Sequence, residues 1–208
     1  LSVRRLLEAY RRGIFPWYNH DQPILWWSPD PRLVLLPEAL HVARSLRKRL
    51  RRGDYQLSLN QAFGAVIRGC AGDRADADGT WLSEAMIQAY VRLHQAGYAH
   101  SVEVWSGNEL VGGLYGVRLG PVFFGESMFS HRSDASKCAM VLLCQLAREE
   151  QIQLIDCQVY TDHLASLGAC EISRDAFTQR LDELLTDVPP APCRGWQLQS
   201  LDSQPLAS

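Results

Sequence analysis

The fold is decided by FFGESMFS at positions 123–130, read together with LIDCQ at positions 154–158. Both stretches have the apolar, aromatic and β-branched content of strands, which we expect over 123–128 and 153–158. Each carries a carboxylate near its C-terminal end: Glu126 in the first and Asp156 in the second. Strand interiors seldom bury an acid without a partner, so two acids at matching positions predict a site built across one sheet. The alternative is that each acid is a satisfied buried group or lies just past its strand.

The neighbouring sequence predicts an α+β fold. Before the second stretch we expect three consecutive strands, over 100–105, 109–117 and 122–128, joined by turns. A helix from Ser133 or Asp134 to 149 connects the last of them to the strand at 153–158. An antiparallel meander, a helix, a strand and a further helix form an α+β layer pattern, and a GNAT-type acyltransferase domain has this order.

Other elements follow from capping residues and periodicity. Ser2 predicts the start of a helix over 3–12, and Ser83 that of a helix over 83–94. Further helices are expected over 38–52, from Asn60 to 67, at 161–168 and over 174–185, with strands at 33–36 and 55–59. The stretch 69–79 reads as a loop, and the tail after Pro189 has no periodicity.

Composition excludes several classes of protein. The 208 residues are 47% hydrophobic and 21% charged, which fits a globular domain with at most a small extra lobe. No apolar run is long enough for a membrane helix, and the start does not resemble a signal peptide. Six cysteines occur without CxxC spacing, so neither a zinc site nor a set of disulfides is expected. The aspartates within 73–78 lack the closing glutamate of a calcium loop.

Charge is divided unevenly along the chain. Residues 1–52 contain 11 Lys and Arg against 4 Asp and Glu, and six of these basic residues lie between Arg44 and Arg52. A dense basic helix favours contact with an anionic partner such as nucleic acid. The alternative is a solvated basic face with no partner.

Five blocks carry a family resemblance, in family order: GIFPWY at 13–18, WWSPDPR at 26–32, GESMFS at 125–130, IDCQ at 155–158 and LASLGA at 164–169. Together they resemble the bacterial leucyl/phenylalanyl-tRNA–protein transferases. The resemblance implies a GNAT-like acyltransferase domain at 32–190, the remainder of a small N-terminal lobe at 1–31 and an irregular tail at 191–208. Because the chain begins at Leu1 inside a helix pattern, we expect it to lack the first residues of the family.

The same resemblance implies an activity. Family members move Leu or Phe, and Met less well, from aminoacyl-tRNA to the α-amine of proteins that begin with Arg or Lys, which marks these proteins for N-degron degradation. The implied enzyme is a cytoplasmic monomer that needs no membrane, metal or cofactor. The ester of aminoacyl-tRNA is already activated and an α-amine loses its proton easily, so aligning the two can supply most of the acceleration.

The family's reactive positions map onto acids and an amide. Asp156 and Gln158, two apart on one strand, share a face and are expected to relay a proton from, or orient, the attacking amine. The sequence leaves general base catalysis and orientation both open. Glu126 is expected to hold the cationic acceptor.

The remaining expected site positions bind the substrates, and most of them are apolar, aromatic or basic. The side chain of the transferred amino acid is expected to contact Leu114, Phe123, Met128, Leu143 and Ile155. By pattern alone these five residues are ordinary core. Ser130 joins the substrate-binding set, and Trp17 and Trp81 are expected to stack on the terminal adenosine, whereas Trp26 and Trp27 are taken as structural. The tRNA backbone is expected to contact Arg44, Arg47, Lys48, Arg51 and Arg52.

Two other functions compete with this interpretation. An acyl-CoA-dependent N-acetyltransferase would share the fold, but it would need a glycine-rich phosphate loop, and residues 131–135 lack one. A non-enzymatic RNA-binding module would explain the basic helix but not the paired acids. Cys157 should point away from Asp156 and Gln158, so it is not expected to be a nucleophile, and His163 lacks a Ser-His-Asp pattern.

Overall fold

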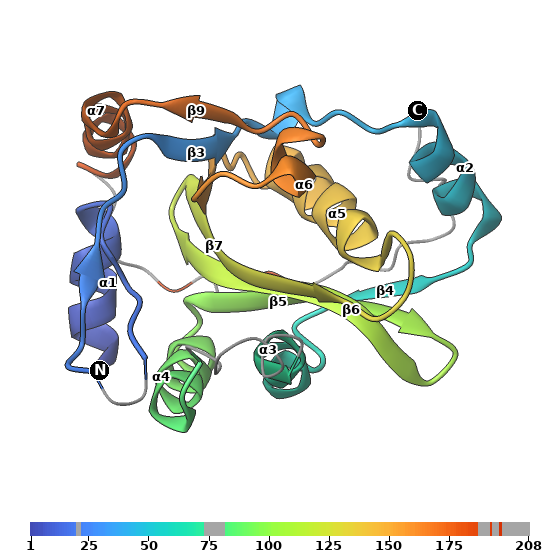
Figure 1. The fold of residues 1–208 in the computed structure, drawn as a ribbon, viewed down its shortest axis with the longest axis horizontal. Helices are drawn as coiled ribbons and strands as arrows, with labels where there is room; N and C mark the ends of the chain where they lie inside the picture. Colours follow the sequence, from blue (N-terminus) through green and yellow to red (C-terminus); the bar gives the residue numbers. More distant parts are fainter. Residues whose placement is uncertain (20–21, 73–81, 187–191, 193–195, 197–208) are drawn as a thin grey trace.

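A seven-stranded mixed sheet forms the centre of the structure (Figure 1). The structure is a computed structural model that describes residues 1–19, 22–72, 82–186, 192 and 196. The strands of this sheet are β3 Arg32–Leu35, β4 Gln56–Leu59, β5 Ala99–Ser106, β6 Glu109–Leu119, β7 Val122–Ser130, β8 Leu154–Gln158 and β9 Cys170–Ile172. Their order is β4-β5-β6-β7-β8-β3-β9, and only β7 and β8 pair in parallel. The predicted α+β class and its central meander are confirmed.

Helices cover both faces of the sheet. They are α1 Val3–Arg11, α2 Arg44–Arg52, α3 Phe63–Gly72, α4 Glu84–Gln95, α5 Ala135–Glu149, α6 Asp162–Ala165 and α7 Arg174–Leu185, with a short 3₁₀ helix at Pro37–Ala39. In Figure 1, α3 and α4 lie against one face and α5 lies against the other. In the part of the chain that the structure describes, no helix is long and apolar enough to span a membrane.

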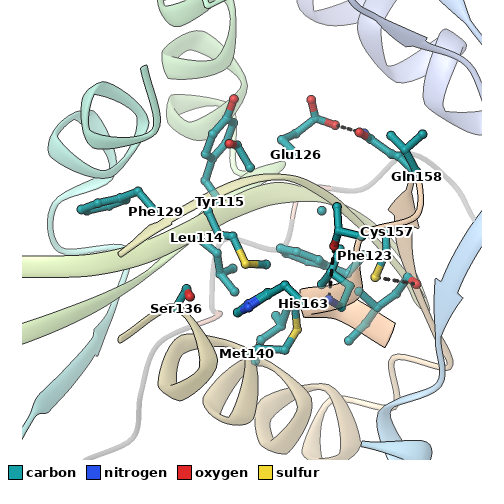
Figure 2. Close-up of a pocket in the computed structure, with 18 of the residues that line it drawn as sticks. Leu114, Tyr115, Phe123, Glu126, Phe129, Ser136, Met140, Cys157, Gln158 and His163 are labelled. Carbon is teal, nitrogen blue, oxygen red and sulfur yellow. Dashed lines mark hydrogen bonds between the residues drawn. The ribbon is translucent and has the colours of Figure 1, made fainter. Parts of the chain in front are cut away.

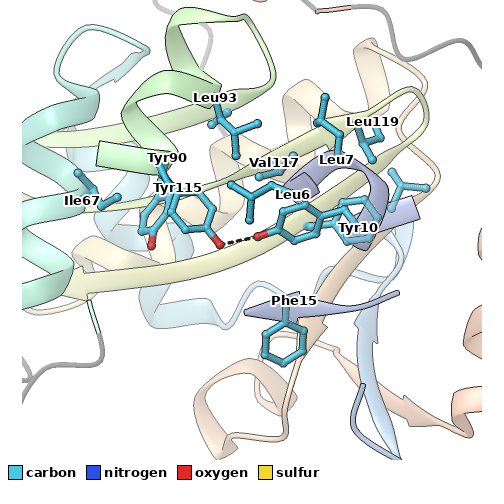
Figure 3. Packing of buried hydrophobic residues seen from close by; sticks show 14 of the residues in the cluster. Leu6, Leu7, Tyr10, Phe15, Ile67, Tyr90, Leu93, Tyr115, Val117 and Leu119 are labelled. Carbon is cyan, nitrogen blue, oxygen red and sulfur yellow. Dashed lines mark hydrogen bonds between the residues drawn. The ribbon is translucent and has the colours of Figure 1, made fainter. Parts of the chain in front are cut away.

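Strand alternation divides the core into two clusters. Tyr115 and Phe124 belong to the cluster beneath α3 and α4, whereas their neighbours Leu114 and Phe123 belong to the cluster beneath α5. This is the expected result of side chains that point to opposite faces at successive positions. The first cluster also receives α1, as Figure 3 shows, so the N-terminal helix packs directly on the sheet.

The N-terminal segment contributes a separate two-stranded sheet. Ser2 caps α1, as predicted, by accepting a hydrogen bond from the backbone N of Arg5 at 3.3 Å. After α1, β1 Phe15–Pro16 pairs antiparallel with β2 Trp26–Trp27. The chain then enters the main sheet at β3. The two strands of the small sheet, and β9, were not predicted because two or three residues show no periodicity.

Two helix boundaries differ from the prediction. The helix expected over 38–52 begins only at Arg44, because the preceding chain is extended and His41 donates its backbone N–H to the carbonyl of Leu167 at 2.9 Å. The helix expected from Asn60 begins at Phe63 and continues to Gly72, into the predicted loop. Asn60 does not cap it, since its side chain accepts from the backbone N of Ser101 at 3.1 Å. In both cases a tertiary contact overrides the local signal.

Candidate active site

A cavity of about 390 Å³ lies where β7 and β8 stop pairing, between these strands, α5, α6 and β1 (Figure 2). The parallel ladder runs from Val122–Leu154 to Phe124–Asp156 and goes no further, so the residues that follow on each strand face a gap. Most of the predicted site residues line this cavity: Trp17, Leu114, Phe123, Glu126, Met128, Ser130, Leu143, Ile155 and Gln158.

One end of the cavity is polar and holds Glu126 and Gln158. The Nε2 of Gln158 donates to Oε1 of Glu126 at 2.9 Å. Glu126 lies at an irregularity in the β6–β7 ladder, where Tyr115 pairs with Ser127 and the next residue pairs with Gly125. It is therefore the extra residue of a β-bulge, a device that re-aims a side chain. Gln158 ends β8 with φ +63°, a conformation that residues with a Cβ rarely adopt.

Two buried tyrosines support Glu126 from behind. The hydroxyl of Tyr90, on α4, donates to Oε2 of Glu126 at 2.6 Å, and it lies 2.5 Å from the hydroxyl of Tyr10, on α1. Burial raises the pKa of Glu126 to about 7, an effect that the tyrosines and Gln158 partly oppose and that the charge of Asp156 reinforces. Burial likewise raises the pKa of both tyrosines, so each remains a hydrogen-bond donor at neutral pH.

Asp156 lies behind the polar end and does not line the cavity. Its side chain is fully buried, and both oxygens accept from the guanidinium of Arg32, at 2.8 and 2.6 Å. Oδ1 also accepts the backbone N–H of Gln158 at 2.9 Å. Asp156 and Gln158 are thus joined through the backbone of Gln158, whereas a relay between their side chains was expected. The positive φ of Gln158 removes the strict alternation on which that expectation rested.

The other end of the cavity is apolar. Leu114, Phe123, Leu143 and Ile155 are almost fully buried, and Met128, the register partner of Leu114, is half-buried beside them. Sequence reasoning missed Met140, which lines this end from α5 (Figure 2). The available signal was helical spacing: Ser136, Met140 and Leu143 lie four and three residues apart and so share a face.

Aromatic and polar groups line the mouth and walls. Trp17 is 41% exposed, and its carbonyl accepts from Nε1 of Trp27 at 2.6 Å, so the neighbouring indole helps to fix it. Trp81, the other predicted platform, lies outside the described residues. Ser130 donates from Oγ to the carbonyl of Arg132 at 2.8 Å and accepts from the backbone N of Ser136 at 3.3 Å, which links β7 to the start of α5.

Two further groups in the cavity were not predicted to bind anything. Within the part of the chain that the structure describes, Nε2 of His163 and Oγ of Ser127 are buried and have no hydrogen-bond partner. Both can therefore bond a polar atom of a ligand. Cys157 was expected to point away from Gln158, but both residues line the cavity because the turned backbone at Gln158 breaks the alternation. Burial raises the pKa of the Cys157 thiol well above its usual value, which disfavours a thiolate nucleophile. The described residues contain no cluster of side chains that could hold a metal ion.

The basic cluster lies on α2. The five residues predicted to contact nucleic acid, Arg44, Arg47, Lys48, Arg51 and Arg52, are all exposed. Leu46 anchors the helix in the core, and Arg49 donates from Nε to Oδ2 of Asp134 at 2.9 Å, directly before α5. Among the residues that the structure describes, only Arg52 of the five forms an ion pair, with Asp54 at 3.3 Å. This face therefore offers uncompensated positive charge.

Comparison with models of known families identifies the family to which the chain belongs. The model of the leucyl/phenylalanyl-tRNA protein transferase family matches residues 34–182, and the model of the N-terminal domain of that family matches residues 1–30. The chain belongs to the leucyl/phenylalanyl-tRNA protein transferase family. The predicted resemblance is therefore confirmed, and with it the class of aminoacyltransferase enzymes.

Individual relatives of the transferase family are similar over most of their length. A leucyl/phenylalanyl-tRNA–protein transferase from Stutzerimonas stutzeri is 59% identical over 181 residues, which is 87% of this chain and 80% of the relative. One from Nitrosospira multiformis is 58% identical over 185 residues, which is 89% of this chain and 80% of that relative. Among solved structures, a GCN5-related N-acetyltransferase from Kribbella flavida is similar with a TM-score of 0.42 and 13% identity, over 77% of this chain and 57% of that one. That likeness is too weak to add to the argument.

Proposed function

We propose that this transferase moves Leu or Phe, and Met less well, from aminoacyl-tRNA to the α-amino group of proteins that begin with Arg or Lys, and so marks them for N-degron degradation. The observation that carries the proposal is the two-ended cavity. Its apolar end suits one large uncharged side chain, and its polar end presents a carboxylate and a carboxamide to a cationic acceptor.

The reaction forms one bond and breaks one. The acceptor amine attacks the carbonyl carbon of the aminoacyl ester, an amide bond forms, and the ester bond to the terminal ribose breaks. The amine gives up one proton, and the ribose oxygen leaves as a hydroxyl. Because the ester is already activated, holding amine and carbonyl in contact is the main task of the site.

The acceptor is assigned to the polar end. Glu126 accepts from Tyr90 and Gln158, and its ionised form would pair with the acceptor's cation. The carboxamide of Gln158 donates from nitrogen to Glu126, which leaves its oxygen to accept an N–H from the attacking amine. Asp156 would then orient Gln158 by accepting its backbone N–H, because both carboxylate oxygens already accept hydrogen bonds from Arg32.

The donor is assigned to the rest of the cavity and to α2. The transferred side chain would contact Leu114, Phe123, Met128, Leu143 and Ile155, together with Met140. Trp17, and Trp81 by family resemblance, would stack on the terminal adenosine, and Ser130, which also lines the cavity, would contact the donor. The exposed cations of α2 would neutralise tRNA phosphates.

The remaining expectations are part of the same proposal. We assign residues 1–31 to a small N-terminal lobe, 32–190 to the catalytic domain and 191–208 to a tail. The enzyme would work as a cytoplasmic monomer without a cofactor.

The test is a transfer assay with matched donors and acceptors. Radiolabelled Phe-tRNA and Leu-tRNA are offered with otherwise identical peptides that begin with Arg, Lys or Ala, and radiolabelled acetyl-CoA is offered in parallel. We expect label on the Arg and Lys peptides from both aminoacyl-tRNAs and none on the Ala peptide. Transfer from acetyl-CoA alone, or equal labelling of all three peptides, would refute the proposed donor or acceptor.

A further inference from the structure

Arg32 is one of the most deeply buried charged residues that the structure describes. Its side chain is 1% exposed, and all three guanidinium nitrogens donate: Nε and Nη2 to the carboxylate of Asp156, and Nη1 to the carbonyl of Gly13 at 3.1 Å. The guanidinium carbon lies 4.4 Å from the ring centre of Phe177 and 5.0 Å from that of Phe15. Arg32 does not line the cavity, so its role cannot be direct contact with a substrate.

The contacts of Arg32 continue to the cavity in two steps. Asp156, held by two parallel N–H···O bonds, has a fixed orientation, and its Oδ1 accepts the backbone N–H of Gln158. This bond spans two residues, as in an Asx-turn, and holds the backbone of Gln158 where the chain turns with φ +63°. The N–H of Val159 closes the same turn on the carbonyl of Cys157 at 2.8 Å. The turned backbone places the carboxamide of Gln158 against Glu126. Strained backbone persists only where its surroundings enforce it, and here Asp156, oriented by Arg32, holds the turn on one side while the Val159–Cys157 bond holds it on the other.

We propose that Arg32 is a positioning residue for aminoacyl transfer, which acts through Asp156 to set the backbone of Gln158 and thereby the Gln158–Glu126 pair. This inference rests on the proposed function. It assigns Asp156 to orientation, because its oxygens are occupied by Arg32 and by the Gln158 backbone and it has no face toward the cavity. It also gives the N-terminal segment a role in the site, since Gly13 and Phe15 hold the guanidinium from the other side.

A lysine should not replace Arg32. Two parallel bonds to one carboxylate and a third to a carbonyl require the planar fork of a guanidinium, whereas an ammonium is a point charge on a flexible stem. Arg32→Lys therefore keeps the positive charge but loses the geometry. Arg32→Gln removes the charge and leaves the carboxylate of Asp156 buried without an ionic partner, which strongly destabilises the folded state. The double variant Arg32→Gln/Asp156→Asn removes both charges and keeps a side-chain oxygen that can accept from the backbone of Gln158.

The chain offers a matched control. Arg118 is also nearly buried, and it donates to the carboxylate of Glu150 at 3.2 Å and to the carbonyl of Gly120 at 3.2 Å. It does not line the cavity. Arg118→Lys and Arg118→Gln thus report what the loss of a buried arginine does to this fold in the absence of any link to Gln158.

The experiment measures kcat and KM for transfer of Phe from Phe-tRNA to an Arg-starting peptide, at a temperature below the Tm of every variant. The Tm of each variant is measured in parallel. We expect Arg32→Lys to lower kcat by about tenfold to a hundredfold, the effect of misplacing a group near the reacting atoms by about an ångström, with little change in KM for Phe-tRNA. Arg118→Lys should lower Tm comparably and leave kcat unchanged. The double variant should be more active than Arg32→Gln, because its buried groups are neutral.

Two results would overturn the inference. If the Tm of Arg32→Lys shows that this variant is folded and its kcat equals that of the wild type, Arg32 only stabilises the fold. If the double variant is folded but no more active than Arg32→Gln, the carboxylate of Asp156 is needed for itself and Arg32 does not act by positioning. Failure of the wild-type protein to label the Arg-starting peptide would instead refute the proposed function.

Discussion

Glu126 and Gln158 meet across the gap that opens when β7 and β8 stop pairing, with Nε2 of Gln158 2.9 Å from Oε1 of Glu126. Neither residue has an ordinary strand conformation, since one is the extra residue of a bulge and the other has φ +63°. The contact therefore depends on two local irregularities that are each supported from behind, one by tyrosines and one by Asp156. Such support is typical of groups that must keep one geometry through a reaction.

Acceptor binding should depend on pH through Glu126. Since burial raises its pKa to about 7, the carboxyl group is increasingly protonated below that pH and then attracts a cation less. The groups that face it are Tyr10, Tyr90, Gln158 and the charge of Asp156. We expect KM for an Arg-starting peptide to rise by up to about tenfold for each pH unit below 7.

Glu126→Gln should make this KM high at every pH and remove its dependence on pH near 7. The measurement is KM for the peptide between about pH 5 and about pH 9. The exposed Glu149, replaced by Gln, is the control and should behave as the wild type does. A wild-type KM that stays flat through pH 7 would mean that Glu126 does not bind the cation.

Stability should depend on pH through the same carboxyl group. An acid with a raised pKa binds its proton more tightly in the folded state, so its contribution is fully present below the ordinary value of 4.5 and is lost as pH rises through about 7. At 1.36 kcal/mol per pKa unit, the wild-type free energy of unfolding should fall relative to that of Glu126→Gln by about 3 kcal/mol across this window. Urea unfolding of both proteins at a series of pH values measures the difference. Parallel stability curves would contradict the raised pKa.

The sheet and part of the site could be predicted because both follow local rules. Alternating strands, turn residues and helix caps identified the meander and the helices around it. The sequence also placed Glu126 and Asp156 near the ends of two strands and predicted a site there. The structure puts Gln158, and not Asp156, beside Glu126 in the cavity.

The support of the site could not be predicted in this way. Arg32 comes directly before the strand expected at 33–36, and its partner Asp156 is 124 residues away in sequence. A glycine inside a strand, such as Gly125, indicates a bulge but does not identify Glu126 as the extra residue. The turn at Gln158 has no sequence signal either, because it is held by hydrogen bonds that form only in the folded chain. Helical spacing places Met140 on one face with Ser136 and Leu143, but α5 is apolar on nearly every side, so this spacing alone does not distinguish cavity from core.

The α2 cations should govern tRNA binding through phosphate contacts. Replacing Arg47, Lys48 and Arg51 with Gln should weaken Phe-tRNA binding and reduce the steepness of its salt dependence by roughly one unit per lost contact. Aminoacyl-adenosine lacks those phosphates, so transfer from this minimal donor should change little. Binding is measured over a range of salt concentrations, with Arg68→Gln/Arg180→Gln, exposed on other helices, as the control. An equal loss with both donors would show that α2 acts on the fold.

Selection of the donor amino acid should come from the apolar end of the cavity. The contacts available there are dispersive, and one methylene in such a pocket is worth about 1–3 kcal/mol, so the preference should be graded. Leu and Phe should both be transferred, Met detectably and Val poorly. Met128→Ala enlarges the cavity opposite Leu114. It should slow transfer of Leu more than that of Phe, because the smaller side chain fills the added space less well.

The decisive measurement is transfer of Leu, Phe, Met and Val carried by one and the same tRNA body, so that only the amino acid differs. Met86, fully buried on α4 and not part of the cavity lining, provides the control: Met86→Ala should lower Tm and leave the ratio of Leu to Phe transfer unchanged. The Met128 variant should move that ratio toward Phe by about tenfold, which is the low end of the range for a hydrophobic pocket. If Val on this tRNA body were transferred as fast as Leu by the wild-type enzyme, the cavity would not select the donor, and the assignment of Met128 to it would be wrong.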